Sequence, residues 1–114
     1  MFRGAARLKL DTKSRIAVPS RHREALQELC GGQLVVTVDP MTQDPCLMLY
    51  PLPVWEAIER RLTTTPALKR QVRNLKRILM GYATDVELDA QGRVRIPQTL
   101  RDFAGLETDI MLVG

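Results

Sequence analysis

One ten-residue pattern occurs twice in the chain and indicates how the chain folds. Its first copy reads Leu10-Asp11-Thr12-Lys13-Ser14-Arg15-Ile16-Ala17-Val18-Pro19. After a shift of 78 residues it returns as Leu88-Asp89-Ala90-Gln91-Gly92-Arg93-Val94-Arg95-Ile96-Pro97. Extended to Arg23 and Arg101, the copies are identical at five of fourteen positions. An internal repeat at this long period predicts two copies of one structural unit.

Each copy predicts a β-hairpin. The apolar residues Leu8, Leu10, Ile16 and Val18 stand at alternate positions on either side of a short polar segment, and the second copy repeats the pattern. This alternation is typical of two strands that pair across a tight turn. A Pro then ends the second strand, because proline has no N–H to donate to the ladder.

The polar segments contain the residues of a structured turn. Asp11 and Asp89 open the turns, where a carboxylate accepts hydrogen bonds from backbone N–H groups just ahead of it. Gly92 stands where a positive φ is expected, whereas Ser14 in the equivalent place predicts a slightly different first turn. The Arg four residues after each Asp can fold back and pair with it. A single such pair usually only fastens a turn, but its repetition with the same Pro and second Arg favours a further role.

The rest of the first copy predicts a helix, a second hairpin and another helix. Helical spacing over residues 21–29 stops at Gly31. The runs 34–38 and 46–50 are expected to pair, with the later strand buried on both faces because it is apolar almost throughout. The helix that follows Pro53 has one apolar face, formed by Trp55, Ile58 and Leu62.

A basic helix is expected between the copies. Thr65 is its predicted N-cap and Pro66 its first residue, and apolar side chains recur at helical spacing over 67–80. The other face is basic, with Lys69, Arg70, Arg73, Lys76 and Arg77. The favoured interpretation is a linker packed by its apolar stripe, and contact with a neighbouring subunit or with DNA phosphate stays open.

The second copy is shorter than the first. It predicts strand, turn, strand, a helix over 97–104 and a strand over 110–113, but not the strand and helix that follow in the first copy. We therefore expect a first unit with its following helix (1–62), a basic linker helix (63–81) and a second unit (82–114).

Positive charge is concentrated in two segments of a chain whose formal net charge is +4. Residues 1–23 carry seven Lys or Arg and one acid, and residues 63–81 carry five and none. Residues 24–62 and 82–114 are each net acidic. Basic segments on an otherwise acidic chain favour a polyanion partner, most simply nucleic acid, over an ordinary solvated surface.

Composition and motifs argue against several other classes of protein. No run of about 18 apolar residues predicts a membrane span and no signal peptide is recognisable, so a cytoplasmic location is expected. Cys30 and Cys46 lack metal-ligand spacing and are expected to be a reduced pair. His22 has no catalytic constellation or nucleotide-binding motif to join. We expect no catalysis, no small-molecule substrate, no metal and no cofactor.

Basic residues surround the first hairpin, namely Arg3, Arg7, Lys9, Lys13, Arg15, Arg21 and Arg23. A two-stranded β-ribbon fits the major groove of B-DNA, where some of these side chains could reach base edges while others neutralise phosphate. RNA is disfavoured because the five aromatic residues do not cluster into a stacking platform.

The second copy keeps only part of this charge. Arg93 and Arg101 persist, whereas three basic positions of the first copy become Glu87, Gln91 and Thr99, and Arg95 is new. The first hairpin is therefore expected to be the stronger DNA contact, and the second a weaker contact or mainly a structural partner.

Taken together, these features resemble the MraZ family. The resemblance rests on both hairpins, on the opening Met1-Phe2-Arg3-Gly4, on Cys46-Leu47-Met48-Leu49-Tyr50-Pro51-Leu52-Pro53-Val54-Trp55, and on the closing Met111-Leu112-Val113-Gly114. It implies an α+β fold in which two AbrB-like swapped-hairpin β units form an intrachain pseudo-dimeric, barrel-like sheet with short helices. It also implies a further strand and helix at the end of the second unit.

The resemblance further implies a sequence-specific DNA-binding transcriptional regulator of the division and cell-wall gene cluster, including its own promoter. The expected partners are double-stranded promoter DNA with tandem short repeats and further copies of the chain in a ring, located at the nucleoid. The candidate DNA-binding residues are Arg3 and six positions that match the family's basic positions: Lys9, Lys13, Arg15, Arg23, Arg93 and Arg101. Asp11, Asp89 and Gly92 are expected to structure the turns.

Two other functions stay open. One is an antitoxin-like protein-interaction module with secondary DNA binding, which a long tail wrapped around a partner would favour. The other is a ring scaffold that binds DNA without sequence preference.

Overall fold

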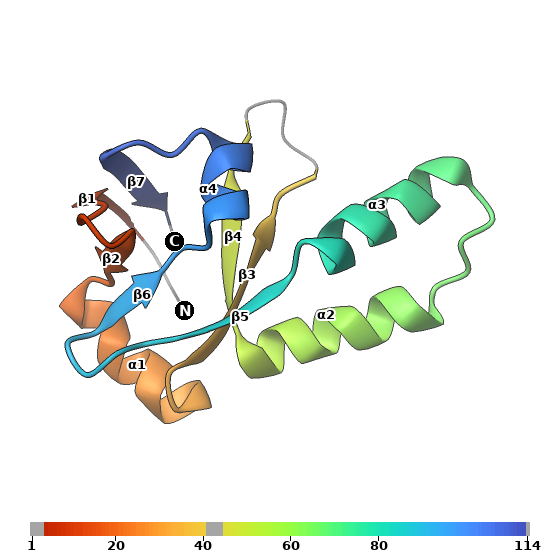
Figure 1. Cartoon of the computed structure of the whole chain (residues 1–114). Helices are drawn as coiled ribbons and strands as arrows, with labels where there is room; N and C mark the ends of the chain where they lie inside the picture. The colour runs from red at the N-terminus through yellow and green to blue at the C-terminus, as the bar shows by residue number, and fades with distance from the viewer. Residues whose placement is uncertain (1–3, 41–44, 114) are drawn as a thin grey trace.

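The computed structural model describes residues 4–40 and 45–113 as an α+β fold (Figure 1). The strands are β1 (Ala5–Lys9), β2 (Arg15–Ala17), β3 (Gln33–Val38), β4 (Leu47–Pro51), β5 (Thr84–Glu87), β6 (Arg93–Arg95) and β7 (Asp109–Val113). The helices are α1 (Ser20–Cys30), α2 (Leu52–Thr64), α3 (Arg70–Gly81) and α4 (Gln98–Ala104). The predicted α+β class and most of the predicted elements are therefore confirmed.

The strands form small antiparallel sheets, and β3 is the central strand of the largest, with order β4-β3-β5. The predicted pairing of the third and fourth strands is confirmed by the register of Val36 with Leu49. The prediction that the fourth strand is buried on both faces is wrong. Because β4 lies at the sheet edge, its residues from Leu47 to Tyr50 are only half-buried, whereas β3 is buried from Leu34 to Val38.

The two strands that flank each repeated turn do not pair with each other. Instead β1 pairs with β7, β2 with β6, and β5 with β3, so every strand beside a turn pairs with a strand of the other copy. The simple hairpin predicted for each copy is corrected accordingly. Alternation of apolar residues indicates which face of a strand is buried, but it does not indicate which strand lies beside it.

The pairing of β2 with β6 has local two-fold symmetry. Its register sets Arg15 opposite Arg95, Ile16 opposite Val94 and Ala17 opposite Arg93. A shift of 78 residues converts the first of these pairs into the third and leaves the central pair unchanged. The buried faces of both strands join the core, together with Val18, Leu26, Leu34, Val36, Val38, Leu88, Ile96 and Leu100.

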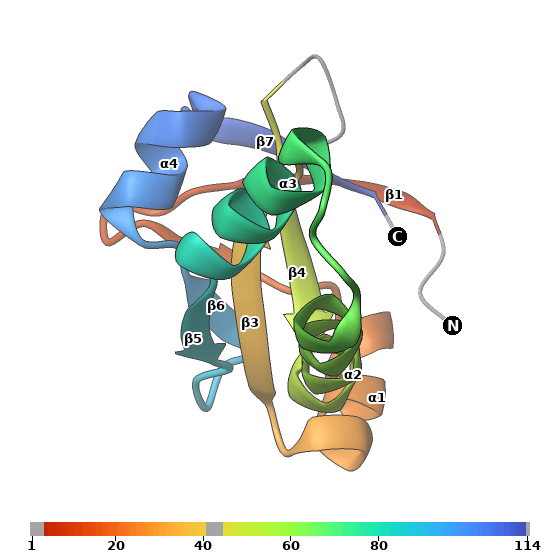
Figure 2. The ribbon, with the colours of Figure 1, turned by 90° about the vertical axis from the view of Figure 1, so that its right-hand side faces the viewer.

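Helices α2 and α3 extend away from the β2–β6 ribbon, as two views of the molecule show (Figures 1 and 2). The predicted N-cap role of Thr65 is wrong, because Thr65 is the C-cap of α2 and α3 begins at Arg70. The hydroxyl groups of Thr63, Thr64 and Thr65 donate to the carbonyls of Arg60 and Arg61. They thus give hydrogen-bond donors to carbonyl groups in the last turn of α2.

Within the described ranges no sheet closes on itself, so the open sheets do not show the expected barrel-like closure. No described helix combines the length and apolar character that crossing a membrane requires.

Candidate nucleic-acid interface

The first repeated turn is built around the carboxylate of Asp11. Its Oδ1 accepts hydrogen bonds from the backbone N–H groups of Lys13 and Arg15 at 2.8 and 2.9 Å. Its Oδ2 accepts from Nε of Arg15 at 2.8 Å. The Asp11 N–H donates to the Arg15 carbonyl at 2.9 Å and closes the turn. One carboxylate therefore fixes both the backbone of the turn and the direction of the Arg15 side chain.

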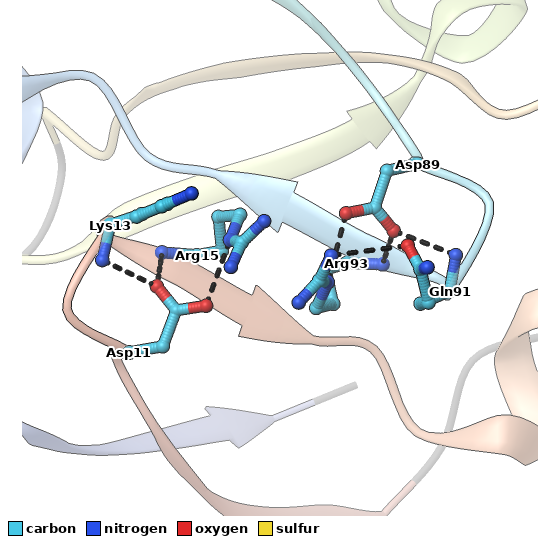
Figure 3. Close-up of polar contacts among 6 residues, drawn as sticks. All are labelled: Asp11, Lys13, Arg15, Asp89, Gln91 and Arg93. Carbon is cyan, nitrogen blue, oxygen red and sulfur yellow. Dashed lines mark hydrogen bonds and ion pairs between the residues drawn. The ribbon is translucent and has the colours of Figure 1, made fainter.

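The second turn repeats this geometry. Asp89 accepts from the N–H groups of Gln91 and Arg93 at 2.9 and 2.8 Å, and from Nε of Arg93 at 2.9 Å. Nη2 of Arg93 also donates to Oε1 of Gln91 at 3.1 Å. Figure 3 shows Arg15 and Arg93 lying between the two turns, each held by its own Asp.

Ser14 and Gly92 adopt the same left-handed backbone conformation, with φ of 63° and 73°. The prediction that the first turn differs from the second is therefore wrong. Two hydrogen bonds hold Ser14 in this strained region, one from its N–H to Asp11 and one from the N–H of Ile96 to its carbonyl, at 3.0 and 2.9 Å. The equivalent bonds in the second turn join Gly92 to Asp89 and to Val18.

Hydrogen bonding keeps both turn carboxylates ionised. The backbone N–H of Arg15 is the main cause that lowers the pKa of Asp11 below its ordinary value of 3.8, and the Arg15 side chain adds to the shift. In the second turn, the backbone N–H of Arg93 lowers the pKa of Asp89 in the same way. At neutral pH each Asp is a charged acceptor, which strengthens its hold on the arginine.

The outer face of the β2–β6 ribbon presents these arginines to solvent. Ile16 and Val94 point into the core, so the alternate residues of both strands point outward. The side chains of Arg15 and Arg93 are 23% and 30% exposed. Because Nε of each arginine binds its Asp, the outer nitrogens are the part of each guanidinium that can meet a ligand.

Of three further predicted contacts, one lies on the first turn, one on another sheet and one outside the described residues. Lys13 is exposed on the first turn. Lys9 is exposed on β1, where the register sets it opposite Asp109 of β7 rather than on the β2–β6 ribbon. Arg3 lies outside the described residues.

Arg23 and Arg101 are partly buried. Nε of Arg23 donates to the carbonyl of Val18 at 2.6 Å, and a Cβ added to Gly92 would collide with the Arg23 side chain. Nη2 of Arg101 donates to Oε1 of Gln98, while its buried Nε has no hydrogen-bond partner among residues 4–40 and 45–113. Arg23 of α1 thus packs against Gly92 in the turn of the other copy. DNA contact by Arg23 and Arg101 stays a prediction.

The ribbon face also carries Arg95, which is exposed and directly opposite Arg15. The sequence marks Arg95 only as a basic residue that the first copy lacks. Its position beside the first turn depends on the pairing of β2 with β6, and no local pattern contains that information.

Comparisons of this chain with a family model and with individual proteins identify the same family. The family described as "MraZ protein, putative antitoxin-like" matches residues 1–78 and 79–114. "Transcriptional regulator MraZ" of Thioalkalivibrio sulfidiphilus is 55% identical over all of this chain and 74% of its own length. The proteins of that name from Alkalilimnicola ehrlichii and Pseudomonas aeruginosa are 54% and 52% identical over the whole chain and 75% and 74% of their own lengths.

A solved structure gives a more distant likeness. The solution structure of PHS018 from Pyrococcus horikoshii aligns with 94% of this chain and 83% of its own at 15% identity, with a TM-score of 0.45. That score is too low to bear on the fold. The match of the family to both parts of the chain and the high identity to its members agree with the motifs described above. The chain therefore belongs to the MraZ family.

Proposed function

We propose that this chain is a sequence-specific, double-stranded DNA-binding transcriptional regulator whose reading surface is the outer face of the β2–β6 ribbon. The observation that carries the proposal is the pair of arginines, Arg15 and Arg93, each aimed by a turn carboxylate on one exposed two-stranded ribbon. The relatives named as transcriptional regulators support the same class of function.

The physical basis is the match between an oriented guanidinium and the groups on DNA. A two-stranded ribbon is narrow enough for the major groove. Arginine can donate two parallel hydrogen bonds to a guanine edge or to phosphate, and this requires a fixed direction. Asp11 and Asp89 supply that direction before DNA arrives, which lowers the entropy lost on binding. Lys13 on the turn adds a cation that needs less orientation.

The two copies, in this proposal, form a swapped-hairpin pseudo-dimer. The reciprocal pairing of strands between residues 4–38 and 82–113 supports that arrangement, with the linker helix over 63–81 between the units.

The regulatory target follows from the family resemblance. We propose that the chain acts on the division and cell-wall gene cluster, including its own promoter, and is associated with the nucleoid in the cytoplasm. Several copies assembled in a ring on tandem short repeats would bind through effective concentration, because each ribbon offers few contacts by itself.

Fluorescence anisotropy tests this function. Labelled duplexes carry either the region upstream of the gene for this chain or a scrambled version, and the wild type is compared with Arg15→Ala over a salt series. We expect the wild type to prefer the promoter, and Arg15→Ala to lose both affinity and preference. The slope of log K against log salt then measures the phosphate contacts.

A second function is favoured by one observation, the antitoxin-like description of the family. A protein-interaction module could use the exposed apolar side chains of Met111 and Val113 on β7, which are 53% and 71% exposed. If the wild type and Arg15→Ala bind both duplexes weakly and equally, sequence-specific DNA binding is contradicted and a protein-interaction module is favoured.

A further inference from the structure

Arg95 and Arg15 face each other across the β2–β6 ladder. Directly opposite residues of an antiparallel pair lie on one face with Cβ atoms about 4.5–5.5 Å apart, and like charges there are destabilising. Within residues 4–40 and 45–113, the ion pairs are Arg15 with Asp11 and Arg93 with Asp89, so no carboxylate compensates Arg95. The free protein therefore bears a repulsion that an anionic ligand would relieve.

The two ends of the ribbon differ in charge although their turns have the same geometry. At the first end, Asp11 offsets Arg15, and the charges of Lys13 and Arg95 remain. At the second end, Asp89 offsets Arg93, and the two equivalent positions are the neutral Gln91 and Ala17. The first end thus has a formal charge of +2 and the second end of zero, counting these eight residues.

We propose that Arg95 belongs to the DNA site of the first turn, where Lys13 and Arg95 together hold one phosphate group of the duplex beside the base edge that Arg15 reads. The site is then composite, because β6 of the second copy completes a turn of the first. This inference rests on the proposed DNA-binding function and adds a residue and a ligand group to it.

The surroundings of Arg95 favour phosphate over a base edge as its ligand. Base reading requires a fixed direction, which Asp11 gives to Arg15. Arg95 has no hydrogen-bonded side-chain partner among the described residues to fix it. An exposed cation without a fixed direction serves charge neutralisation, which depends on proximity more than on direction.

The test compares the wild type with Arg95→Ala, Arg95→Lys and Arg60→Ala on the promoter and scrambled duplexes over a salt series. Arg60→Ala is the matched control, because it removes one exposed Arg from α2, which extends away from the ribbon (Figure 1). We expect Arg95→Ala to weaken binding to both duplexes by about tenfold. The salt slope should become shallower by about 0.9, the value for one phosphate contact. Arg95→Lys should retain most of the affinity and Arg60→Ala all of it.

The double variant Lys13→Ala/Arg95→Ala, compared with the two single variants, tests whether the two residues share one contact. If they hold the same phosphate, its loss of affinity is smaller than the product of the two single losses. If the loss of affinity in the double variant equals the product of the two single losses, the two residues act independently and the composite site is overturned. A thermal midpoint for Arg95→Ala equal to or above that of the wild type is also expected, since the substitution removes a like-charge pair, and a clear decrease would instead identify a structural role.

Failure of the inference and failure of the proposed function give different results. If Arg15→Ala loses binding while Arg95→Ala binds as Arg60→Ala does, DNA reading stands and the role of Arg95 is overturned. If the wild type shows neither preference nor salt-dependent binding, the proposed function fails, and the inference fails with it.

Discussion

Ile16 and Val94 pair at the centre of the β2–β6 ribbon, and the local two-fold axis that relates the repeated turns passes between them. Both side chains are almost fully buried, at 4% and 0% exposure. The hydrogen bonds on either side are reciprocal: Val18 donates to Gly92 and Ile96 donates to Ser14. Neither turn is therefore complete without the other copy, and the stability of one depends on the packing of both.

The first prediction concerns this central pair. Truncation of Ile16 to Ala should lower the free energy of unfolding by about 2–5 kcal/mol, because it leaves a cavity in the core. Val94→Ala should destabilise as well, and the double variant should depart from the sum because the side chains share one site. Urea unfolding measures these changes, with Val54→Ala, half-exposed on α2, as the control. If Ile16→Ala were as stable as the wild type, the β2–β6 ribbon would not lie at the centre of the core.

The second prediction uses the equivalent positions Ser14 and Gly92, both at positive φ. Ser14→Gly should stabilise the chain by about 0.5–1 kcal/mol, because glycine adopts this conformation without steric strain. Gly92→Ala should destabilise it by about 1–2 kcal/mol from backbone strain alone, and further because the new Cβ collides with Arg23. Thermal unfolding of both variants checks the opposite signs, and a shift in the same direction would contradict the shared geometry.

The third prediction concerns pH. The pKa of Asp11 is lower in the folded chain than its ordinary value of 3.8, chiefly through the N–H of Arg15. Such a carboxyl stabilises the fold above its unfolded pKa and loses that contribution as the pH falls through its folded pKa. The stability difference between wild type and Asp11→Asn should thus be constant above about pH 5 and shrink below about pH 4.

Urea unfolding from pH 3 to 6 measures that difference. Glu107→Gln removes an exposed carboxylate that forms no ion pair within the described ranges and serves as the control. A difference for Asp11→Asn that grows on acidification would contradict the role of the carboxylate in the turn.

The fourth prediction concerns Thr37, which is fully buried on β3 and donates from Oγ1 to the Leu79 carbonyl of α3 at 2.8 Å. Thr37→Val should leave that carbonyl unsatisfied at a cost of about 1–2 kcal/mol and loosen the end of α3. Trypsin should then cleave α3 faster under native conditions, since its arginines and lysines become accessible. Thr37→Ser keeps the hydroxyl and should be cleaved like the wild type. Equal cleavage rates for Thr37→Val and Thr37→Ser would contradict a role for this hydrogen bond in holding α3.

Much of the fold could be predicted from local signals. The Asp and Gly of the turns, the glycine after α1 and the prolines before α2 and α4 each act on neighbouring backbone, so residues 11–15 and the helix starts were predictable. The partner of each strand was not, because alternation is the same whether β2 pairs with β1 or with β6. Thr65 was assigned to the wrong helix end because Thr before Pro can begin a helix or end one.

The candidate interface was predictable only where it is local. Asp11 and Arg15 are four residues apart and meet within one turn, so their contact follows from spacing. Arg95 is brought beside Arg15 by a pairing between residues 80 apart in the chain. The packing of Arg23 over Gly92 also depends on that pairing, so its structural contact could not be separated from a DNA contact by sequence alone.

Hydrogen–deuterium exchange of the intact chain with and without the promoter duplex locates the DNA interface without any substitution, and so tests whether the β2–β6 ribbon is the binding surface. The ribbon account predicts slower exchange over residues 11–17 and 89–95 on addition of the promoter duplex, a weaker effect with the scrambled duplex, and unchanged exchange over α2. Protection confined to α3 or to β7, with both turns unchanged, would contradict the claim that the β2–β6 ribbon binds DNA.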